Sequence, residues 1–566
     1  MPQNEETECL APQQETPMQN TTKNESSPNL TKIKKKKPKK KTGAPAEPIS
    51  EYYQKALVDY PVSLRNTKAK GRHAAASGPI AEGTTVCHEQ ATAFVVRSEF
   101  IDQQCHVCLD TLATKLMCSD CKKSFYCSQA CLDRDTTHPK VCSIISQVDT
   151  IGRSTDTDPD LLRLMVLLMA ERMEEADIPE ENKTEYKPLS QTPYWCVEDL
   201  LSHREHADRA FINVLTEASQ RLVSEMPESM AMSVDDMVTL ACRINSNAHG
   251  LGDNQSRNTD VALGLFPVGA MFFNHACNPN TAFVGMPNGQ LAFRTIRPVK
   301  TDEELTVSYI DLYASRDERR QDLLKTKHFW CKCKRCTTPM ENSVDRFLQS
   351  VVCTSCSKDV YVIPPASIEE LNKGEKSLGE TWTCAGCGHV ASVSKVNEAI
   401  EKANASYTAG MYALRQRRDY RSACRQLEPL AKTVLPSQAT KLPAGEIHPQ
   451  NSIRLNASIP LLNCLRHQDN IKGAIEVNRT ILDVLDEHAK QSLPDKTAEI
   501  SDFWQNLGEL CDAMAEQCRV SGRQPLQKKW YKEARDAYSQ AAKVRAVVFG
   551  PEHPKTQFVE RCALRV

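Results

Sequence analysis

Hydrophobic and polar positions alternate in different ways along the 566 residues. Residues 1–50 show no hydrophobic periodicity and are rich in Gln, Asn, Thr, Pro and Lys, so this segment is predicted to be disordered. Order is expected from about residue 51. There, short β-branched runs such as Thr84–Val86 and Phe94–Val96 are separated by turns that contain glycine. Further short strands are expected between Leu263 and Tyr309.

Helical periodicity marks the middle and the last third of the chain. Asp158 can cap a helix whose apolar residues recur from Leu161 to Met169, and Ser233 can cap a second helix over 235–243. From about residue 393 the pattern is almost entirely helical, with clear runs at 399–414, 471–488, 500–518 and 528–548. The predicted fold class is therefore α+β with several domains and an all-helical C-terminal domain.

Composition narrows the class of protein. A chain of 566 residues and 63.3 kDa exceeds what one hydrophobic core usually serves. Lys and Arg (71) nearly balance Asp and Glu (72), so no overall field indicates a nucleic-acid binder. The mean hydropathy of -0.48 and the lack of a long apolar stretch predict no membrane span. Because the N-terminus is acidic and polar, the protein is expected in the nucleus, the cytoplasm or both.

A lysine tract stands out within the N-terminal segment. Residues 32–41 contain eight lysines. Such a run is either a solvated charge run or a signal for nuclear import or weak nucleic-acid contact, and the sequence leaves both interpretations open.

The 24 cysteines indicate metal binding, because a reducing compartment disfavours disulfides and no secretion signal is visible. Between residues 105 and 142, eight ligands fall into four short pairs. Two pairs complete a tetrahedron, so the segment fits two zinc ions, which would supply the folding free energy that its small core lacks. The pairs are Cys105 with Cys108, Cys118 with Cys121, Cys127 with Cys131, and His138 with Cys142.

Two further cysteine clusters follow. Cys331, Cys333 and Cys336 leave a tetrahedral zinc one ligand short, and Cys277 is the candidate for the missing ligand, although a buried free cysteine is the plainer interpretation. The other cluster forms a closed, zinc ribbon-like site in which His389 is an unnecessary substitute ligand. Its members are Cys353, Cys356, Cys384 and Cys387. All four zinc ions are predicted to be structural.

These motifs carry a family resemblance. Residues 105–142 resemble the MYND zinc finger, a protein-interaction module, and the Asn274–Asn280 motif followed by Cys331–Cys336 resembles the SET and post-SET region of lysine methyltransferases. A SET domain split by a MYND finger resembles the SMYD family, and the ribbon with the helical tail resembles its arthropod SmydA branch. In MYND fingers the pairs interleave, which implies one zinc on Cys105, Cys108, Cys127 and Cys131 and one on Cys118, Cys121, His138 and Cys142. In SET proteins the Cys277 equivalent completes the post-SET zinc.

The resemblance also implies a domain order. The SET domain would cover 51–309, interrupted by the MYND finger at 105–142 and by a helical linker and SET insert at 143–250. After it would come a post-SET zinc region, a ribbon-like segment and a helical domain resembling tetratricopeptide repeats, at 310–340, 350–392 and 393–566.

The activity implied is that of a protein-lysine N-methyltransferase that uses S-adenosylmethionine on a histone or non-histone protein, with a role in gene regulation. Tyr309 would be the catalytic channel residue. Asn247 would end a strand that begins at Arg243. The cofactor-binding residues implied are Gly71, Arg72, His73, Asn247, Asn274, His275 and Phe329.

Two departures from the family pattern keep an alternative open. The Gly-x-Gly turn of the family reads Gly71-Arg72-His73, and Lys327 stands where many relatives carry a second channel tyrosine. By themselves, Tyr309 would be an ordinary strand residue and Asn274 with His275 a turn. The alternative is a scaffold that kept the SET fold, lost turnover and recruits protein partners through the MYND finger and the helical domain.

Overall fold

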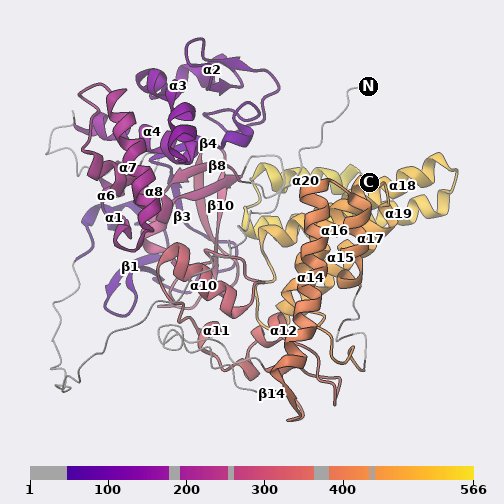
Figure 1. Cartoon of the computed structure of the whole chain (residues 1–566). Coiled ribbons are helices and arrows are strands. Elements are labelled where there is room, and N and C mark those ends of the chain that lie inside the picture. Colours follow the sequence, from indigo (N-terminus) through magenta and orange to yellow (C-terminus); the bar gives the residue numbers. More distant parts are fainter. Residues whose placement is uncertain are drawn as a thin grey trace, which may run out of the picture.

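The computed structural model describes residues 48–176, 192–252, 260–362, 381–432, 435, 437 and 440–565. The lysine tract and nearly all of the predicted disordered segment lie outside the described residues. Figure 1 shows a region of strands and helices, indigo to magenta, beside a helical C-terminal region, orange to yellow. The predicted α+β class is confirmed.

The N-terminal half of the molecule contains several small β-sheets. The strands pair antiparallel in a hairpin of β1 and β2 and in two three-stranded sheets, ordered β10-β11-β3 and β4-β8-β7, whereas β9 and β12 pair in parallel. The predicted strands near Thr84–Val86 and Phe94–Val96 are confirmed as β3 and β4. The bounds are β1 Val62–Thr67, β2 Gly71–Ala76, β3 Thr85–Gln90, β4 Ala93–Val96, β7 His249–Gly252, β8 Asp260–Leu265, β9 Asn274–His275, β10 Thr281–Met286, β11 Gln290–Thr295 and β12 Thr306–Val307.

Helices pack on these sheets and share one hydrophobic core with them. Helix α4 begins at Pro159 and is buried on nearly all sides from Leu161 to Ala170, which explains its continuous apolar run. No helix among the described residues is both long enough and apolar enough to cross a membrane. The bounds are α1 Glu51–Ala56, α3 His138–Thr155, α4 Pro159–Ala176, α6 Trp195–Glu198, α7 Arg209–Ser224, α8 Val234–Asn247 and α9 Pro267–Phe272.

Helix α8 corrects one prediction. Ser233 caps it as expected, because its hydroxyl accepts from the N–H of Asp236 at 3.1 Å. The expected strand from Arg243 to Asn247 is wrong, since these residues form the last turn of α8 and β7 starts only at His249. The helix continues because Ile244 and Ser246 still face the core. A match to a short family motif therefore did not predict the secondary structure of these residues.

The finger and the segments after the SET sheets are small. In the finger, β5 (Leu116–Met117) pairs with β6 (Phe125–Tyr126) before α2 (Gln129–Arg134). Helices α10 (Arg316–Lys327), α11 (Lys334–Thr337) and α12 (Asp345–Gln349) follow the SET sheets. The ribbon-like segment has a sheet of β13 (Tyr361–Val362), β14 (Thr381–Cys384) and β15 (Val390–Ser392).

The C-terminal region is all-helical, as predicted, and its helices pack in succession. The packing is tight where α18 meets α19, since a Cβ on Gly508 would lie 2.7 Å from the Tyr538 ring. The bounds are α14 Val393–Arg417, α15 Tyr420–Ala431, α16 Ser452–His467, α17 Ile471–Ala489, α18 Ala498–Val520, α19 Gln524–Val548 and α20 Pro554–Arg565.

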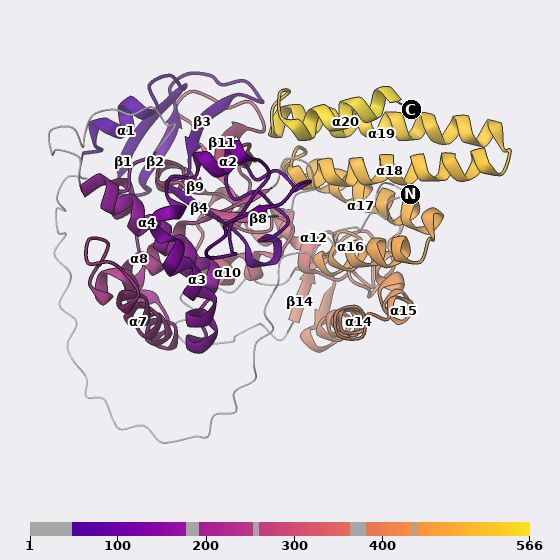
Figure 2. The ribbon, with the colours of Figure 1, turned by 90° about the horizontal axis from the view of Figure 1, so that it is seen from above.

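The helical region docks directly on the sheet of β10, β11 and β3. Val284 and Ala292, on β10 and β11, belong to the same buried cluster as the apolar residues of α16 to α19. Arg294 on β11 donates through Nε to the carbonyl of Val547 in α19 at 3.0 Å. Figure 2 shows α18 and α19 reaching the sheet side of the molecule at one end. The two regions therefore share packed apolar surface.

Candidate functional site

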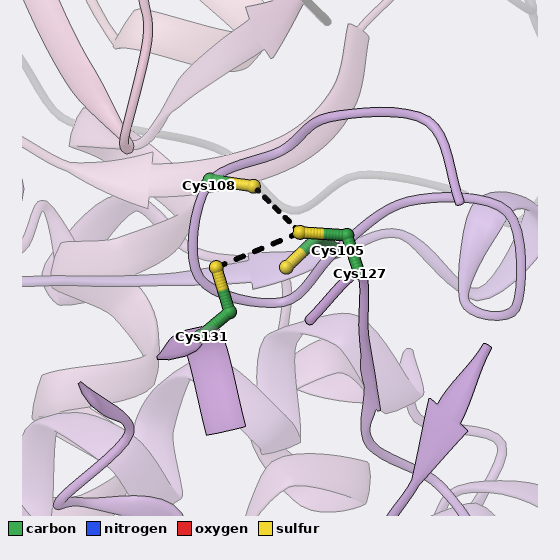
Figure 3. A group of neighbouring side chains, drawn as sticks. All are labelled: Cys105, Cys108, Cys127 and Cys131. Atoms are coloured by element: carbon green, nitrogen blue, oxygen red, sulfur yellow. Dashed lines mark hydrogen bonds between the residues drawn. The ribbon is translucent and has the colours of Figure 1, made fainter. Parts of the chain in front are cut away.

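The finger holds two groups of four metal ligands, and their members interleave along the chain. Figure 3 shows the sulfurs of the first group, Cys105, Cys108, Cys127 and Cys131, pointing toward one another. Cys108 and Cys127 lie 3.6 Å apart (Sγ to Sγ). A tetrahedral zinc with Zn–S bonds of about 2.3 Å separates its sulfurs by about 3.8 Å, so the group fits zinc. The second group is Cys118, Cys121, His138 and Cys142.

In the second finger group the imidazole is oriented as a ligand. His138 points Nε2 at Cys121 Sγ, 3.5 Å away, while its Nδ1 lies 3.1 Å from the Ser124 hydroxyl. A hydrogen bond to the other ring nitrogen is the usual support of a metal-bound histidine. The pairing implied by the MYND resemblance is the one that the structure forms.

The post-SET cluster brings Cys277 to the three later cysteines. Its Sγ lies 3.9 Å from that of Cys331 and 3.5 Å from that of Cys336, and Cys333 completes the group. Cys277 is fully buried. Four converging thiols suit a closed tetrahedral zinc site, which favours the ligand role over the free-cysteine interpretation.

Three buried arginines surround this cluster and converge on one aspartate. Asp345 accepts from Arg316 Nε, from both Arg319 terminal nitrogens and from Arg335 Nε, at 2.9–3.0 Å. Burial alone would raise the pKa of Asp345, but Arg335, Arg319 and Arg316 outweigh it and lower this pKa to about 2. Arg335 also donates to the Cys277 carbonyl at 2.8 Å. A fourth buried arginine, Arg320, donates to the carbonyls of Cys331 and Cys336 at 3.2 and 2.9 Å. The four arginines and Asp345 carry a net charge of +3, which opposes the -2 of a zinc ion with four thiolates.

The ribbon cluster has four thiol ligands like the post-SET cluster, but it is more exposed to solvent. Cys353 lies 3.7 Å from Cys387, and Cys356 lies 3.8 Å from Cys384, measured between sulfurs. Cys387 is exposed. His389 is not a member of the group and instead approaches the Tyr361 hydroxyl with Nδ1 at 2.9 Å. As predicted, four cysteines suffice there.

The predicted channel residue, Tyr309, is fixed by the loop that contains Asn274 and His275. Its hydroxyl donates to the Phe273 carbonyl at 2.8 Å, and its backbone N–H donates to His275 Nδ1 at 3.1 Å. Burial raises the pKa of Tyr309 above its ordinary value, so the phenol stays protonated.

His275 links this tyrosine to the post-SET cluster. Because Nδ1 accepts from Tyr309, the proton of the neutral ring sits on Nε2, which lies 3.2 Å from Cys277 Sγ. Burial lowers the pKa of His275 to about 4 and so favours this neutral form. Both ring nitrogens are therefore engaged within the chain.

Asn274 connects the turn at Gly71 to the loop that binds Tyr309. The Asn274 side-chain amide donates to the carbonyls of Lys70 and Arg72, at 3.3 and 3.2 Å. Gly71 has φ +67° and open space around its Cβ position, whereas the His73 ring is buried and its Nδ1 lies 3.0 Å from the Gly71 carbonyl. The His73 ring therefore points into the protein.

Asn247 and Arg72 both bind the segment Asp199–Ser202. Arg72 donates to the Asp199 carbonyl at 2.8 Å, and Asn247 Nδ2 donates to the Leu201 carbonyl at 2.9 Å. Arg243 and Ser246 bind the Leu200 and Ser202 carbonyls, at 3.2 and 3.3 Å. Four consecutive carbonyls of this segment thus accept from side chains.

Lys327 and Phe329 approach from the end of α10. Lys327 Nζ donates to the Ser246 carbonyl at 2.7 Å and lies 5.8 Å from the centre of the Tyr309 ring. The Phe329 ring is 6.1 Å from that of His275. Lys327 and the Phe273–His275 loop thus lie against Tyr309, whereas Arg72 and Asn247 bind the Asp199–Ser202 segment.

A cavity elsewhere does not contain these residues. A volume of about 290 Å³ lies beside α4, α7 and α8 and is lined by Asn245, Ile244 and Phe211 among others. Asn247, Asn274 and Tyr309 do not line it. The side chains that meet at Tyr309, rather than this cavity, define the candidate site.

The comparisons with known proteins agree with this geometry. Residues 71–310 match the family model described as SET domain. The chain is 25% identical over 286 residues to the histone-lysine N-methyltransferase ASHR1 of Arabidopsis thaliana, across 50% of this chain and 56% of that protein. A SET and MYND domain-containing protein of Dictyostelium discoideum is 25% identical over 360 residues, across 56% and 68% of the two chains. The chain therefore contains a stretch that matches a SET domain, and it is similar to SET and MYND proteins.

A third relative adds detail. The histone-lysine N-methyltransferase SMYD3 of Mus musculus is 25% identical over 274 residues, across 48% of this chain and 60% of that protein. The chain thus spans 56–60% of the length of these methyltransferases. The arthropod SmydA branch stays a prediction.

Some residues around the candidate site were not predicted from the sequence. Asp345 and the arginines of α10 read as ordinary helix charges, and the Asp199–Ser202 segment follows no motif. Spacing reveals ligands that share a turn, whereas these residues meet only after folding. The run Arg316 to Arg320, with three arginines next to a cysteine cluster, was the one available hint.

Proposed function

We propose that the protein is an S-adenosylmethionine-dependent protein-lysine N-methyltransferase. The observation that carries the proposal is Tyr309, whose hydroxyl and backbone N–H are both bound by the Phe273–His275 loop inside the stretch that matches a SET domain. The relatives named histone-lysine N-methyltransferase support the same activity. The acceptor is accordingly a lysine of a histone or another protein.

The residues present suit the ligand that this activity needs. S-adenosylmethionine, when bound, supplies an electrophilic methyl group on a sulfonium. The side-chain amides of Asn247 and Asn274 use Nδ2 within the chain, which leaves the oxygen of each amide to accept from an ammonium group. Phe329 offers a flat apolar face.

Tyr309 would act on the acceptor amine. Because the Tyr309 hydroxyl donates to the Phe273 carbonyl, its oxygen would accept a hydrogen bond from the acceptor amine. This bond would orient the lone pair of the amine nitrogen toward the methyl group. The amine must be neutral to attack, and the buried surroundings of Tyr309 lower the pKa of an amine. Orientation and desolvation, rather than a strong base, would provide the catalysis.

The test is labelled-methyl transfer from S-adenosylmethionine to core histones and to non-histone proteins by the zinc-loaded full chain. Tyr309→Phe is expected to lower kcat at least tenfold, because the amine loses its acceptor. Tyr412→Phe, at a side chain that is 53% exposed on α14, is the matched control. Equal signals from wild type and Tyr309→Phe, or none from either, would contradict the proposal.

A second candidate is a SET-fold scaffold without turnover. The observation that favours it is that Arg72 and Asn247, both predicted to bind the cofactor, already bind the Asp199–Ser202 carbonyls. It predicts no heat of binding and an unmoved thermal midpoint with millimolar S-adenosylmethionine. Under either candidate, the MYND finger and the helical region are proposed to bind protein partners. Nuclear location, a role in gene regulation and nucleic-acid contact through residues 32–41 stay predictions.

A further inference from the structure

Lys327 is placed unusually for a lysine at the end of a surface helix. Its side chain crosses from α10 to α8, where Nζ donates to the Ser246 carbonyl at 2.7 Å. Its charge lies over the Tyr309 ring, 5.8 Å from the ring centre. None of the ion pairs within the described residues includes Lys327. This primary amine is therefore held beside Tyr309 without a carboxylate partner in that part of the chain.

The surroundings of Lys327 are poor in negative charge. Tyr309 and Ser246 touch it and His328 follows it in the chain. The titratable groups around it include His203, His249 and His328, and burial lowers the pKa of each of these imidazoles, which favours the neutral ring. On its own helix, Asp322 is the acidic group that faces it. Burial lowers the pKa of Lys327, and Asp322 offsets this in part. A second ammonium group brought to Tyr309 would meet repulsion from Lys327.

We propose that Lys327 determines acceptor specificity at the Tyr309 site, because its own amine takes the place beside Tyr309 that an acceptor lysine requires. This inference rests on the proposed methyltransferase function. An acceptor lysine must displace the Lys327 side chain from Ser246 and overcome its charge. The wild-type chain would therefore accept only lysines in sequences that bind strongly elsewhere on the surface.

A purely structural role makes a different prediction. Ser246 lies in the last turn of α8, where carbonyls lack helical partners, and a cation there stabilises a helix end. If Lys327 were only such a cap, its replacement would lower the thermal midpoint and leave methyl transfer unchanged or reduced.

The experiment compares Lys327→Met with Lys325→Met in the zinc-loaded full chain. Methionine keeps the unbranched shape and removes the charge, and Lys325 is an exposed residue on the same helix. With core histones as acceptor, Lys327→Met is expected to raise kcat/KM at least tenfold, mainly through a lower KM for histone. The KM for S-adenosylmethionine and the Lys325→Met values should stay at the wild-type level.

A pH series separates charge from shape. The ratio of kcat/KM between Lys327→Met and wild type should fall as the pH rises, because wild-type Lys327 loses its charge below the usual lysine range. Titration of the acceptor cancels in this ratio. A ratio near one at every pH, or no transfer by any variant that binds S-adenosylmethionine, would overturn the inference.

Calorimetry with S-adenosylmethionine distinguishes the two failures. If no variant binds it, the proposed function itself fails. If all variants bind it and wild type transfers methyl groups as well as Lys327→Met does, only the role of Lys327 fails.

Discussion

The post-SET cluster and the ribbon cluster have the same four thiols but very different surroundings. Around Cys277, buried arginines and Asp345 give a net positive charge that opposes the negative charge of a zinc tetrathiolate, and His275 connects the cluster to Tyr309. Around Cys387 the site is exposed, and its neighbours Tyr361 and His389 bind each other. Identical ligands therefore lie beside the candidate site in one region, and in the other they lie where the ribbon packs on the helices α14 to α16.

The largest difference is expected when one ligand is removed from each cluster. Cys277→Ser and Cys387→Ser should each lose about one zinc per chain, measured by elemental analysis. Cys277→Ser should also cost about 5 kcal/mol or more of unfolding free energy, because loss of the zinc unties three buried segments and removes part of the negative charge beside the arginines.

The same two variants show which zinc cluster S-adenosylmethionine binding depends on. Cys277→Ser should weaken S-adenosylmethionine binding at least tenfold, since His275 loses the partner of its Nε2. Cys387→Ser should bind the ligand as wild type does. Equal loss of binding in both variants would show that the ribbon also shapes the site and would break the comparison.

A smaller effect is expected from the counter-charge alone. Asp345→Asn keeps the shape of the side chain but leaves three buried guanidinium groups without a carboxylate. Breaking a buried ion pair in this way costs about 3–5 kcal/mol, which denaturant unfolding would measure.

The control for this variant is Asp512→Asn, in an exposed pair with Arg565. Surface pairs contribute about 0–1 kcal/mol, so this control should unfold as wild type does. A similar small loss for Asp345→Asn would mean that the zinc thiolates by themselves balance the arginines.

The sequence predicted residues that lie close together along the chain, but not those that meet only when separate segments pack. Ligands such as Cys353 and Cys356 share one turn, so their spacing alone identified them, and helical periodicity located α17 and α18. Asp345 gave no signal, because its meeting with Arg316 and Arg335 depends on how three segments pack. The strand expected at Arg243–Asn247 failed for a related reason, since burial of one face extends α8 beyond the motif.

The smallest effect is expected within the ribbon. The Tyr361 hydroxyl accepts from the Thr354 N–H at 3.1 Å and lies 2.9 Å from His389 Nδ1. Tyr361→Phe removes these contacts and a third, to the Thr354 hydroxyl at 2.8 Å, and should cost about 1–2 kcal/mol, since each net hydrogen bond contributes about 0.5–1.5 kcal/mol. Zinc content and methyl transfer should not change, because the hydroxyl contacts of Tyr361 within the described residues stay inside the ribbon. Loss of transfer in this variant, with zinc retained, would instead reveal a link between the ribbon and the Tyr309 site.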